Sequence, residues 1–302
     1  MEKTINPKPY SINKPSVLTS KIQDYVQLVK MRLSILVVFS AAMGFLLASE
    51  GEINWGKLCL LILGGFLVTA SSNGINQVVE RHLDKLMTRT SGRPIPDSRM
   101  RVSEALLVSI LMGVVGVLIL SFGMNLLSGI FGAFALLSYV FIYTPMKRKT
   151  PFAVFAGAIP GAIPPLLGYV AVTGHLDITA YLLYAIQFIW QFPHFWSIAW
   201  VLDDDYKKAG FKMLPSAGGR DKKSAYQALI YTLALIPLGL LPVYFNVSGY
   251  ISAIVITLCG VLFMMQSIQL YRECSIKAAT RLMFGSFLYL PLVQIAMVYD
   301  KM

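Results

Sequence analysis

Long apolar stretches alternate with short polar segments along this 302-residue chain. A helix needs about 20 apolar residues to cross the roughly 30 Å hydrocarbon core of a bilayer. By that length, the pattern predicts nine transmembrane helices near residues 31–49, 57–79, 102–121, 125–143, 152–173, 178–200, 225–245, 248–271 and 281–299. The predicted fold class is therefore all-α, a multi-pass membrane protein.

A shorter amphipathic pattern precedes the first span. Apolar residues recur there at the i, i+3, i+4, i+7 spacing of one helix face, at Ile22, Tyr25, Val26 and Val29. We therefore expect a cytoplasmic N-terminal segment, residues 1–30, with a short helix at the membrane surface, and a single transmembrane domain, residues 31–299. The polar first 20 residues argue against a cleaved signal peptide, and the absence of Arg from residues 1–31 argues against a mitochondrial transit peptide.

Composition agrees with the spans. Hydrophobic residues make up 56% of the chain and charged residues 14%, and the mean hydropathy is +0.64. Soluble chains contain roughly 45–50% apolar and about 25% charged residues. A soluble enzyme, a secreted disulfide scaffold and a disordered chain are excluded, and the three cysteines have neither disulfide nor metal-ligand spacing.

The basic residues are distributed unequally between the two sides of the predicted membrane protein. Of the 26 Lys and Arg, 24 lie before residue 33 or in the connections 80–101, 144–151, 201–224 and 271–281. The other connections and the C-terminus contain only Lys57 and Lys301. Because cytoplasmic loops are rich in Lys and Arg, this predicts a plasma-membrane protein with a cytoplasmic N-terminus. It also explains the net charge of +11 without nucleic acid.

The first candidate site follows the second span. If that helix continues, Asn76, Glu80 and Asp84 lie at i, i+4 and i+8, and each step of four drifts only about 40° around the axis. Three oxygen ligands in a column suit a Mg²⁺ ion that also binds phosphate. Arg89 and Arg93 follow, and guanidinium groups match phosphate oxygens. The alternative is a solvated helix end with topological arginines, but polar Asn76 at membrane depth favours a site.

A second acidic cluster follows the sixth span. Three consecutive carboxylates, Asp203, Asp204 and Asp205, repel one another unless a cation or basic side chains intervene. An ordinary acidic loop is the alternative. Two acidic clusters with nearby basic residues on one membrane face are better explained by one site for a metal-bound, multiply charged anion. The basic triplet 147–149 either reaches that anion or serves orientation alone.

Two further features lie in the fifth and sixth spans. The segment 157–168 contains Gly161 and three prolines, so it cannot form a smooth helix. It is either a kinked span or one opened for a bulky ligand. His194 is an intramembrane histidine and hence a candidate ligand for metal or haem. An interhelical hydrogen bond or an interfacial position is the alternative for His194.

Four blocks of sequence resemble one family. They are N-x-x-x-E-x-x-x-D-x-x-M-x-R-T-x-x-R-P from Asn76, Y-T-P-x-K-R-x-T from Tyr143, G-A-x-P-G-A-x-P-P-x-x-G from Gly157, and H-F-W from His194 followed by D-Y-x-x-A-G-x-K-M-L-P from Asp205. In this order and spacing, across about residues 25–299, they resemble the protohaem IX farnesyltransferase (haem O synthase) branch of the UbiA-type intramembrane prenyltransferases.

The resemblance implies nine transmembrane helices around a central cavity that opens laterally to lipid, with Mg²⁺ and diphosphate at its cytoplasmic mouth. It implies farnesyl diphosphate and haem b as substrates, with haem b prenylated at a vinyl group and then hydrated. At the level of the family alone, it also implies a haem A synthase as partner. The carried-over catalytic residues are Asn76, Glu80, Asp84, Asp204 and Asp205, with Asn76, Glu80, Asp84 and Asp205 as metal ligands. The carried-over diphosphate-binding residues are Arg89, Arg93, Lys147, Arg148 and Lys212, and His194 is a candidate for haem binding.

The chain departs from the pattern at one position. Quinone-directed relatives have an Asp four residues before the position of Asp205, where this chain has Val201. Metal binding at the second motif must therefore differ, with Asp203 or Asp204 compensating or one Mg²⁺ held more loosely. Competing functions are a sister prenyltransferase with another aromatic or tetrapyrrole acceptor, a transporter, and, ranked lowest, a structural assembly subunit.

Overall fold

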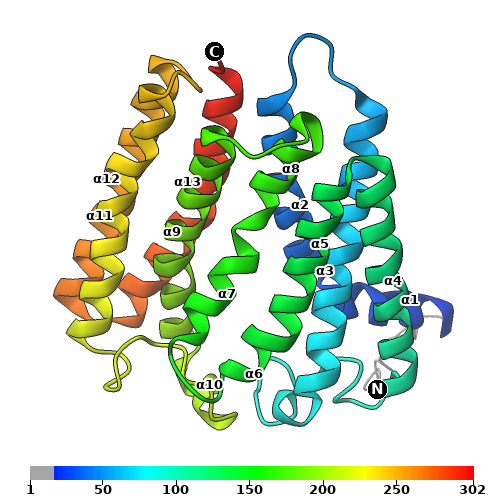
Figure 1. Cartoon of the computed structure of the whole chain (residues 1–302). Helices are drawn as coiled ribbons and strands as arrows, with labels where there is room; N and C mark the ends of the chain where they lie inside the picture. The colour runs from blue at the N-terminus through cyan, green and yellow to red at the C-terminus, as the bar shows by residue number, and fades with distance from the viewer. Residues whose placement is uncertain (1–16) are drawn as a thin grey trace, which may run out of the picture.

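The structure, a computed structural model, describes residues 17–302, and its regular secondary structure there is helical (Figure 1). Of the predicted N-terminal segment 1–30, residues 1–16 lie outside the described residues. The helices of the bundle are α2 (Met31–Ala48), α3 (Trp55–Asp84), α4 (Val102–Gly123), α5 (Leu126–Ser138), α7 (Ala153–Gly161), α8 (Ile163–Thr173), α9 (Ile178–Val201), α11 (Lys222–Tyr244), α12 (Tyr250–Glu273) and α13 (Ile276–Tyr299). The other helices are α1 (Val17–Leu28), η1 (Tyr139–Tyr143), α6 (Thr144–Met146) and α10 (Asp203–Lys208).

Eight segments of the described chain are long and apolar enough to cross a membrane. The segment from α5 through α6 counts as one of them, and α7 with α8 as another. The predicted sixth span is α9, which has 24 residues and packs against α8, α11 and α13, but it is not among the eight. The apolar sequence of this helix is interrupted by Gln187, Gln191 and His194. The multi-pass membrane fold is confirmed, and the count of nine stays a prediction.

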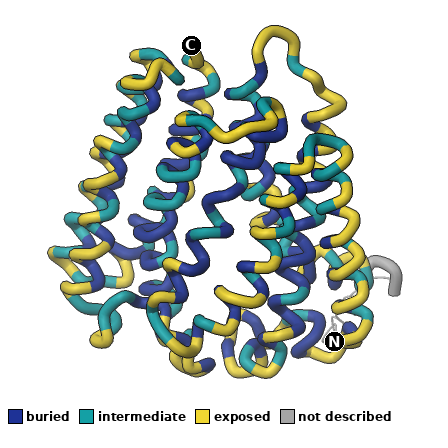
Figure 2. Tube along the Cα trace, in the orientation of Figure 1, coloured by how far each residue is buried: buried dark blue, intermediate teal, exposed yellow. Residues whose placement is uncertain are grey.

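On the outer helices, large apolar side chains are exposed, whereas a soluble protein would bury them. Large apolar side chains such as Leu111, Leu258 and Phe284 are more than half exposed on α4, α12 and α13. Figure 2 shows such exposed positions along the outward faces, with buried positions turned toward the middle of the bundle. Soluble monomers rarely expose apolar patches of this extent, so these faces are the lipid-contacting surface.

Close backbone packing joins α2 to α8 at the centre of the bundle. A Cβ atom at Gly168 would collide with the backbone carbonyl of Ala41, and one at Gly44 with that of Pro165. Small residues allow membrane helices to approach in this way, since apolar burial alone does not drive their association in lipid. This pair forms one wall of the cavity described below.

The loops that carry the candidate site lie at one end of the bundle. In Figure 1 the connections after α3, at α6 and around α10 share the end that bears α1, while the C-terminus lies at the other. Helix α1 crosses the α3 and α4 side of the bundle, where Tyr25 Oη donates to Glu104 at 2.8 Å and Arg99 Nε pairs with Asp24 at 2.9 Å. The placement of α1 on a membrane surface stays a prediction.

Candidate active site

Helix α3 continues beyond the predicted end of its span and aligns the first acidic motif. It ends at Asp84, so Asn76, Glu80 and Asp84 occupy successive i, i+4 positions of one continuous helix. All three are buried, with exposed fractions of 1%, 5% and 0%. The column predicted from spacing therefore exists, and it lies inside the protein instead of in solvent.

This column suits a cation. Glu80 and Asp84 lie in the last turn of α3, where the helix dipole already places partial negative charge. Among the described residues, Asp84 Oδ1 is buried without a hydrogen-bond partner. A buried carboxylate oxygen without a partner is costly. The donor set, two carboxylates and an amide, is of the hard-oxygen type that Mg²⁺ prefers, so the residues present fit that ion.

Two basic side chains from other loops pair with the column. Lys147 Nζ lies 2.8 Å from Glu80 Oε1, and Arg93 Nη1 lies 2.7 Å from Asp84 Oδ2. Burial alone would lower the pKa of Lys147, but the neighbouring Glu80 carboxylate outweighs it and raises that pKa. Buried charged groups are tolerated only when they are paired, and these two basic side chains provide that pairing for the acidic column.

Two members of the site were not predicted from the sequence. Lys30 has a left-handed backbone (φ 48°) at the start of α2, and its Nζ lies 3.5 Å from Asn76 Oδ1. Burial, with help from Arg93 and Lys147, lowers the pKa of Lys30 to about 7. Thr144 Oγ1 accepts from Asn76 Nδ2 at 3.2 Å. Lys30 is one of five lysines before the first span, and nothing in its spacing pointed to Asn76.

The second acidic motif has different surroundings. Asp203 pairs with Lys207 at 2.7 Å, and Asp204 is exposed and pairs with Arg220 at 2.9 Å. Asp205 is the member that contacts another loop: it accepts the backbone N–H groups of residues 88 and 89 at 2.8 and 3.1 Å. Burial opposes ionisation of Asp205, but those N–H groups and a nearby Lys lower its pKa to about 2. Basic side chains thus relieve the repulsion among these carboxylates.

The predicted site residues fall into two groups. The structure brings together Asn76, Glu80, Asp84, Arg93 and Lys147, whereas the side chains of Arg89, Arg148 and Lys212 are exposed. In the described part of the chain, no three His, Cys, Asp or Glu side chains form a group that could hold a metal ion. Asp205 is therefore not brought into one acidic cluster with Glu80 and Asp84. Its predicted role as a metal ligand stays a prediction.

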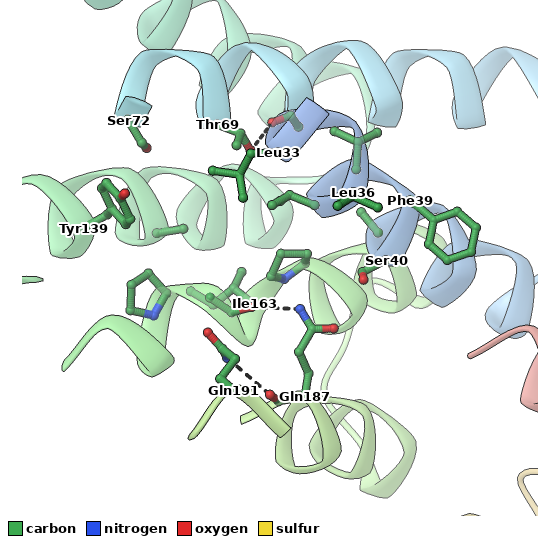
Figure 3. Close-up of a pocket in the computed structure, with 18 of the residues that line it drawn as sticks. Leu33, Leu36, Phe39, Ser40, Thr69, Ser72, Tyr139, Ile163, Gln187 and Gln191 are labelled. Carbon is green, nitrogen blue, oxygen red and sulfur yellow. Dashed lines mark hydrogen bonds between the residues drawn. The ribbon is translucent and has the colours of Figure 1, made fainter. Parts of the chain in front are cut away.

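A cavity of about 360 Å³ begins one turn from the column. Ser72 and Asn73 line it from α3, and Tyr143 lines it from η1, the segment that also brings Lys147 to Glu80. Figure 3 shows Leu33 and Leu36 on another side of this cavity, with Gln187 and Gln191 facing them. None of the described residues that line the cavity is Lys, Arg, Asp or Glu.

The predicted break in the fifth span forms part of the cavity wall. Helices α7 and α8 meet at Ala162, and Pro160 lies in the last turn of α7. Gln187 Nε2 donates to Gly161 O at 2.8 Å, and Gln191 Nε2 donates to Ala158 O at 3.1 Å. Side chains of α9 thus satisfy carbonyls at an interrupted helix, as a break at membrane depth requires. The span is kinked, and its kink borders the cavity.

His194 lines the cavity in a fixed orientation. Its Nδ1 lies 2.7 Å from Ser286 Oγ, and the ring stacks on Trp190 at 4.4 Å. Because the Ser286 hydroxyl donates to Met283 O at 2.6 Å, it accepts from His194 Nδ1–H. That assignment leaves His194 Nε2 with a free lone pair, the state in which imidazole binds metals. The interhelical hydrogen bond expected as an alternative is present, and it also orients the ring as a ligand.

The sequence of this chain is similar to those of known proteins. The model of the UbiA prenyltransferase family matches residues 37–290. A protohaem IX farnesyltransferase of Cytophaga hutchinsonii is 51% identical over 284 residues, 94% of this chain and 99% of the relative. One from Christiangramia forsetii is 44% identical over 295 residues, 96% of each chain.

Solved structures share the fold at low sequence identity. A digeranylgeranylglyceryl phosphate synthase has a TM-score of 0.77 and 21% identity, covering 93% of this chain and 98% of that one. A UbiA homologue from Archaeoglobus fulgidus, bound to GPP and Mg²⁺, has a TM-score of 0.65 and 16% identity, covering 91% of this chain and 99% of that one. These likenesses concern the arrangement of the helices.

Proposed function

The chain belongs to the UbiA prenyltransferase family, and we propose that it transfers the farnesyl group of farnesyl diphosphate to a vinyl group of haem b. Water addition completes the reaction, and haem O and diphosphate are the products. One observation carries the proposal: a buried acidic column paired with Arg93 and Lys147 adjoins an uncharged cavity. The relatives named protohaem IX farnesyltransferase support the choice of donor and acceptor.

We assign Mg²⁺ to the column on α3. Asn76, Glu80 and Asp84 would hold it, and the orphaned Asp84 Oδ1 is the atom that gains most from a cation. When bound, Mg²⁺ neutralises charge on the leaving diphosphate. The A. fulgidus homologue bound to GPP and Mg²⁺ supports this assignment for the family fold.

Arg93 and Lys147 act on the diphosphate directly. Both are cations in a buried site, where electrostatic stabilisation of a leaving group is stronger than in water. Each reaches a carboxylate of the column, so each also lies beside any phosphate bound there. The planar fork of Arg93 suits two phosphate oxygens, while Lys147 contributes a point charge. Ionisation of the allylic C–O bond is the step that these charges favour.

The cavity receives the farnesyl chain and the porphyrin. Its uncharged lining excludes water from the allylic cation until the vinyl group has reacted. The aromatic face of Tyr143 lines this cavity and also lies 4.7 Å from Lys147 Nζ, so it marks the boundary between the charged mouth and the apolar interior. Electron-rich rings at such a boundary stabilise a neighbouring cation.

His194 binds the haem iron through Nε2 in this proposal. Ser286 holds the ring in the required tautomer, and the stacked Trp190 restricts its rotation. We expect His194→Ala to raise the KM for haem b by at least about 10-fold, since loss of a residue that merely orients a metal ligand already weakens metal binding by about 10–100-fold. With metal-free protoporphyrin IX as acceptor, wild type and variant should have the same KM. An equal effect on both porphyrins would contradict iron ligation.

We place the site at the cytoplasmic face of the plasma membrane, because the connections around α1, α6 and α10 contain most of the basic residues. A thiol-reactive, membrane-impermeant probe would test this orientation in cells, on Lys149→Cys and Lys57→Cys proteins whose own three cysteines are replaced by serine. Labelling of residue 57 alone from outside is expected. A haem A synthase as recipient of the product stays a prediction from the family.

The test of the function is an assay on the purified, detergent-solubilised protein. It contains haem b, farnesyl diphosphate and Mg²⁺, with EDTA as control, and porphyrins are identified by mass spectrometry. The expected product is heavier than haem b by one farnesyl group and one hydroxyl group. Consumption of farnesyl diphosphate on another acceptor would overturn the haem assignment. No consumption by folded protein would contradict prenyl transfer itself.

A further inference from the structure

The segment 203–212, which contains α10, contacts the loop after α3 through one carboxylate. Asp205 Oδ1 accepts the backbone N–H of Thr88 at 2.8 Å, and Asp205 Oδ2 accepts that of Arg89 at 3.1 Å. Each oxygen of the carboxylate is therefore engaged by the backbone of the same loop. Hydrogen bonds to a charged acceptor are stronger than neutral ones, so this contact is a firm one between two distant parts of the sequence.

Lys208 adds a second connection at the same place. Its Nζ lies 2.7 Å from Thr88 Oγ1 and 3.1 Å from Asp205 Oδ1. Asp205 therefore accepts from two backbone groups and one ammonium group, and each of these donors also lies on or beside the loop after α3. A carboxylate has about four acceptor positions, so most of its capacity is used within the protein.

The loop held in this way carries Arg93 to the acidic column. Thr90 is fully buried, and its Oγ1 donates to Asp84 O at 2.9 Å. The backbone N–H of Arg93 then donates to Thr90 O at 3.1 Å. The position of the Arg93 guanidinium beside Asp84 thus depends on the path of residues 88–90, and Asp205 holds that path.

The same segment supports the other cation of the site. The backbone N–H of Lys212 donates to the carbonyl of Lys147 at 2.9 Å. The ring of Phe211 is buried, with its centroid 5.9 Å from Lys147 Nζ. One stretch of ten residues therefore fixes both basic groups that pair with the column, although neither of them belongs to it.

We propose that Asp205 is a positioning residue, which clamps the backbone of Thr88 and Arg89 to hold the cation-bearing loop over α3. The segment 203–212 is then a brace for Arg93 and Lys147, and metal binding belongs to the α3 column alone. Val201 fits this role, since a brace needs no second carboxylate at that position. The kinetic consequences rest on the proposed function, but the brace itself is a property of the folded chain.

The structural test is hydrogen–deuterium exchange of the purified full-length protein without substrate, read on peptides that cover residues 85–93. Loss of charge-assisted bonds should make exchange there at least about 10-fold faster in Asp205→Asn than in wild type. Lys208→Met should show a smaller increase, and its matched control Lys207→Met none, because within the described residues the Lys207 side chain pairs with Asp203 and not with the loop after α3. Peptides from α3 and α9 report global folding. Unchanged exchange of residues 85–93 in folded Asp205→Asn protein would overturn the proposal.

The kinetic test separates a brace from a metal ligand. Asp205→Asn should raise the KM for farnesyl diphosphate by about 10-fold, the effect of one displaced charged hydrogen bond. The Mg²⁺ concentration for half-maximal rate should stay within about twofold of wild type, and Lys208→Met should follow the same pattern. A large rise in the required Mg²⁺ concentration in Asp205→Asn, without any in Lys208→Met, would contradict the brace. Altered exchange in a protein that shows no farnesyl transfer would leave the brace standing and refute the proposed function instead.

Discussion

The two acidic motifs of this protein differ in their partners more than in their charge. The carboxylates of Glu80 and Asp84 are buried: Glu80 pairs with Lys147, 67 residues away, and Asp84 pairs with Arg93 of the loop that follows α3. Asp203 and Asp204 pair with Lys207 and Arg220, within 20 residues of the same chain segment. Among the described residues, each motif has one buried carboxylate oxygen without a hydrogen bond, but Asp203 Oδ2 has the Lys207 ammonium 2.7 Å away, whereas the ion pair of Asp84 with Arg93 is made by its other oxygen, Oδ2.

This difference shows that acidic residues at a helix end can serve two purposes. In the last turn of α3, negative charge adds to the dipole of the helix and attracts a cation. In the first turn of α10, the charges of Asp203 to Asp205 are favoured by the dipole and by nearby basic groups. In the roles we propose, the α3 motif binds the ligand and the α10 motif holds the groups that bind it.

The largest effect is expected at the column. Asp84→Asn or Glu80→Gln removes the charge that holds the cation, and the rate should fall by about 10³-fold, the upper range for one electrostatic contact. The matched control is Glu104→Gln, whose side chain pairs with α1 instead. Turnover is measured by product mass spectrometry, and folding of the detergent-solubilised protein by size-exclusion chromatography. Near-normal rates in both variants would refute the metal assignment.

An intermediate effect is expected at Lys147, which contacts both the α3 column and the segment 203–212. Lys147→Met leaves Glu80 buried without its partner and removes a charge from the diphosphate, so kcat/KM should fall by about 10²-fold. Lys147→Arg should recover most of this loss, because it restores the charge. Lys149→Met, an exposed neighbour in the same basic triplet, is the control for net charge. Equal losses in the controls and in Lys147→Met would indicate a general surface-charge effect.

The smallest effect is expected at the local partner of the second motif. Arg220 donates to Trp200 O at the end of α9 and to Asp204, in a partly exposed position. Arg220→Gln should therefore destabilise the protein by about 1 kcal/mol, which lowers Tm by a few degrees, and reduce activity by less than about threefold. Thermal unfolding followed by intrinsic tryptophan fluorescence checks the first part. A loss of activity as large as that of Asp84→Asn would show that the second motif takes part in catalysis directly.

Helix geometry explains how much of the site the sequence could predict. The i, i+4, i+8 spacing of Asn76, Glu80 and Asp84 predicts a column because the α-helix repeats regularly, and the structure has that column. Proline and glycine likewise predicted the break between α7 and α8, since their effect on a helix is local. Properties that depend on a few neighbouring residues could therefore be predicted from the sequence.

Contacts between segments far apart in the sequence could not be predicted from the sequence. The pairing of Lys147 with Glu80 joins residues 67 positions apart, and the sequence left open whether the basic triplet 147–149 reaches the anion or serves orientation alone. Lys30 reaches Asn76 because the chain turns through a left-handed conformation, which a lysine rarely adopts. The partners of Asp205 are backbone N–H groups, and these leave no trace in a sequence because every residue except proline has one.

The most direct measurement is the affinity of the purified protein for inorganic diphosphate, by isothermal titration calorimetry with and without Mg²⁺. Thermodynamic coupling between the two ligands reports on the residues that hold the metal. In wild type, Mg²⁺ should tighten diphosphate binding by at least about 10-fold. The account predicts that Asp84→Asn abolishes this enhancement, whereas Asp205→Asn weakens diphosphate binding and keeps the enhancement. An enhancement that survives in Asp84→Asn, or disappears in Asp205→Asn, would contradict the division between a metal-binding column and a brace.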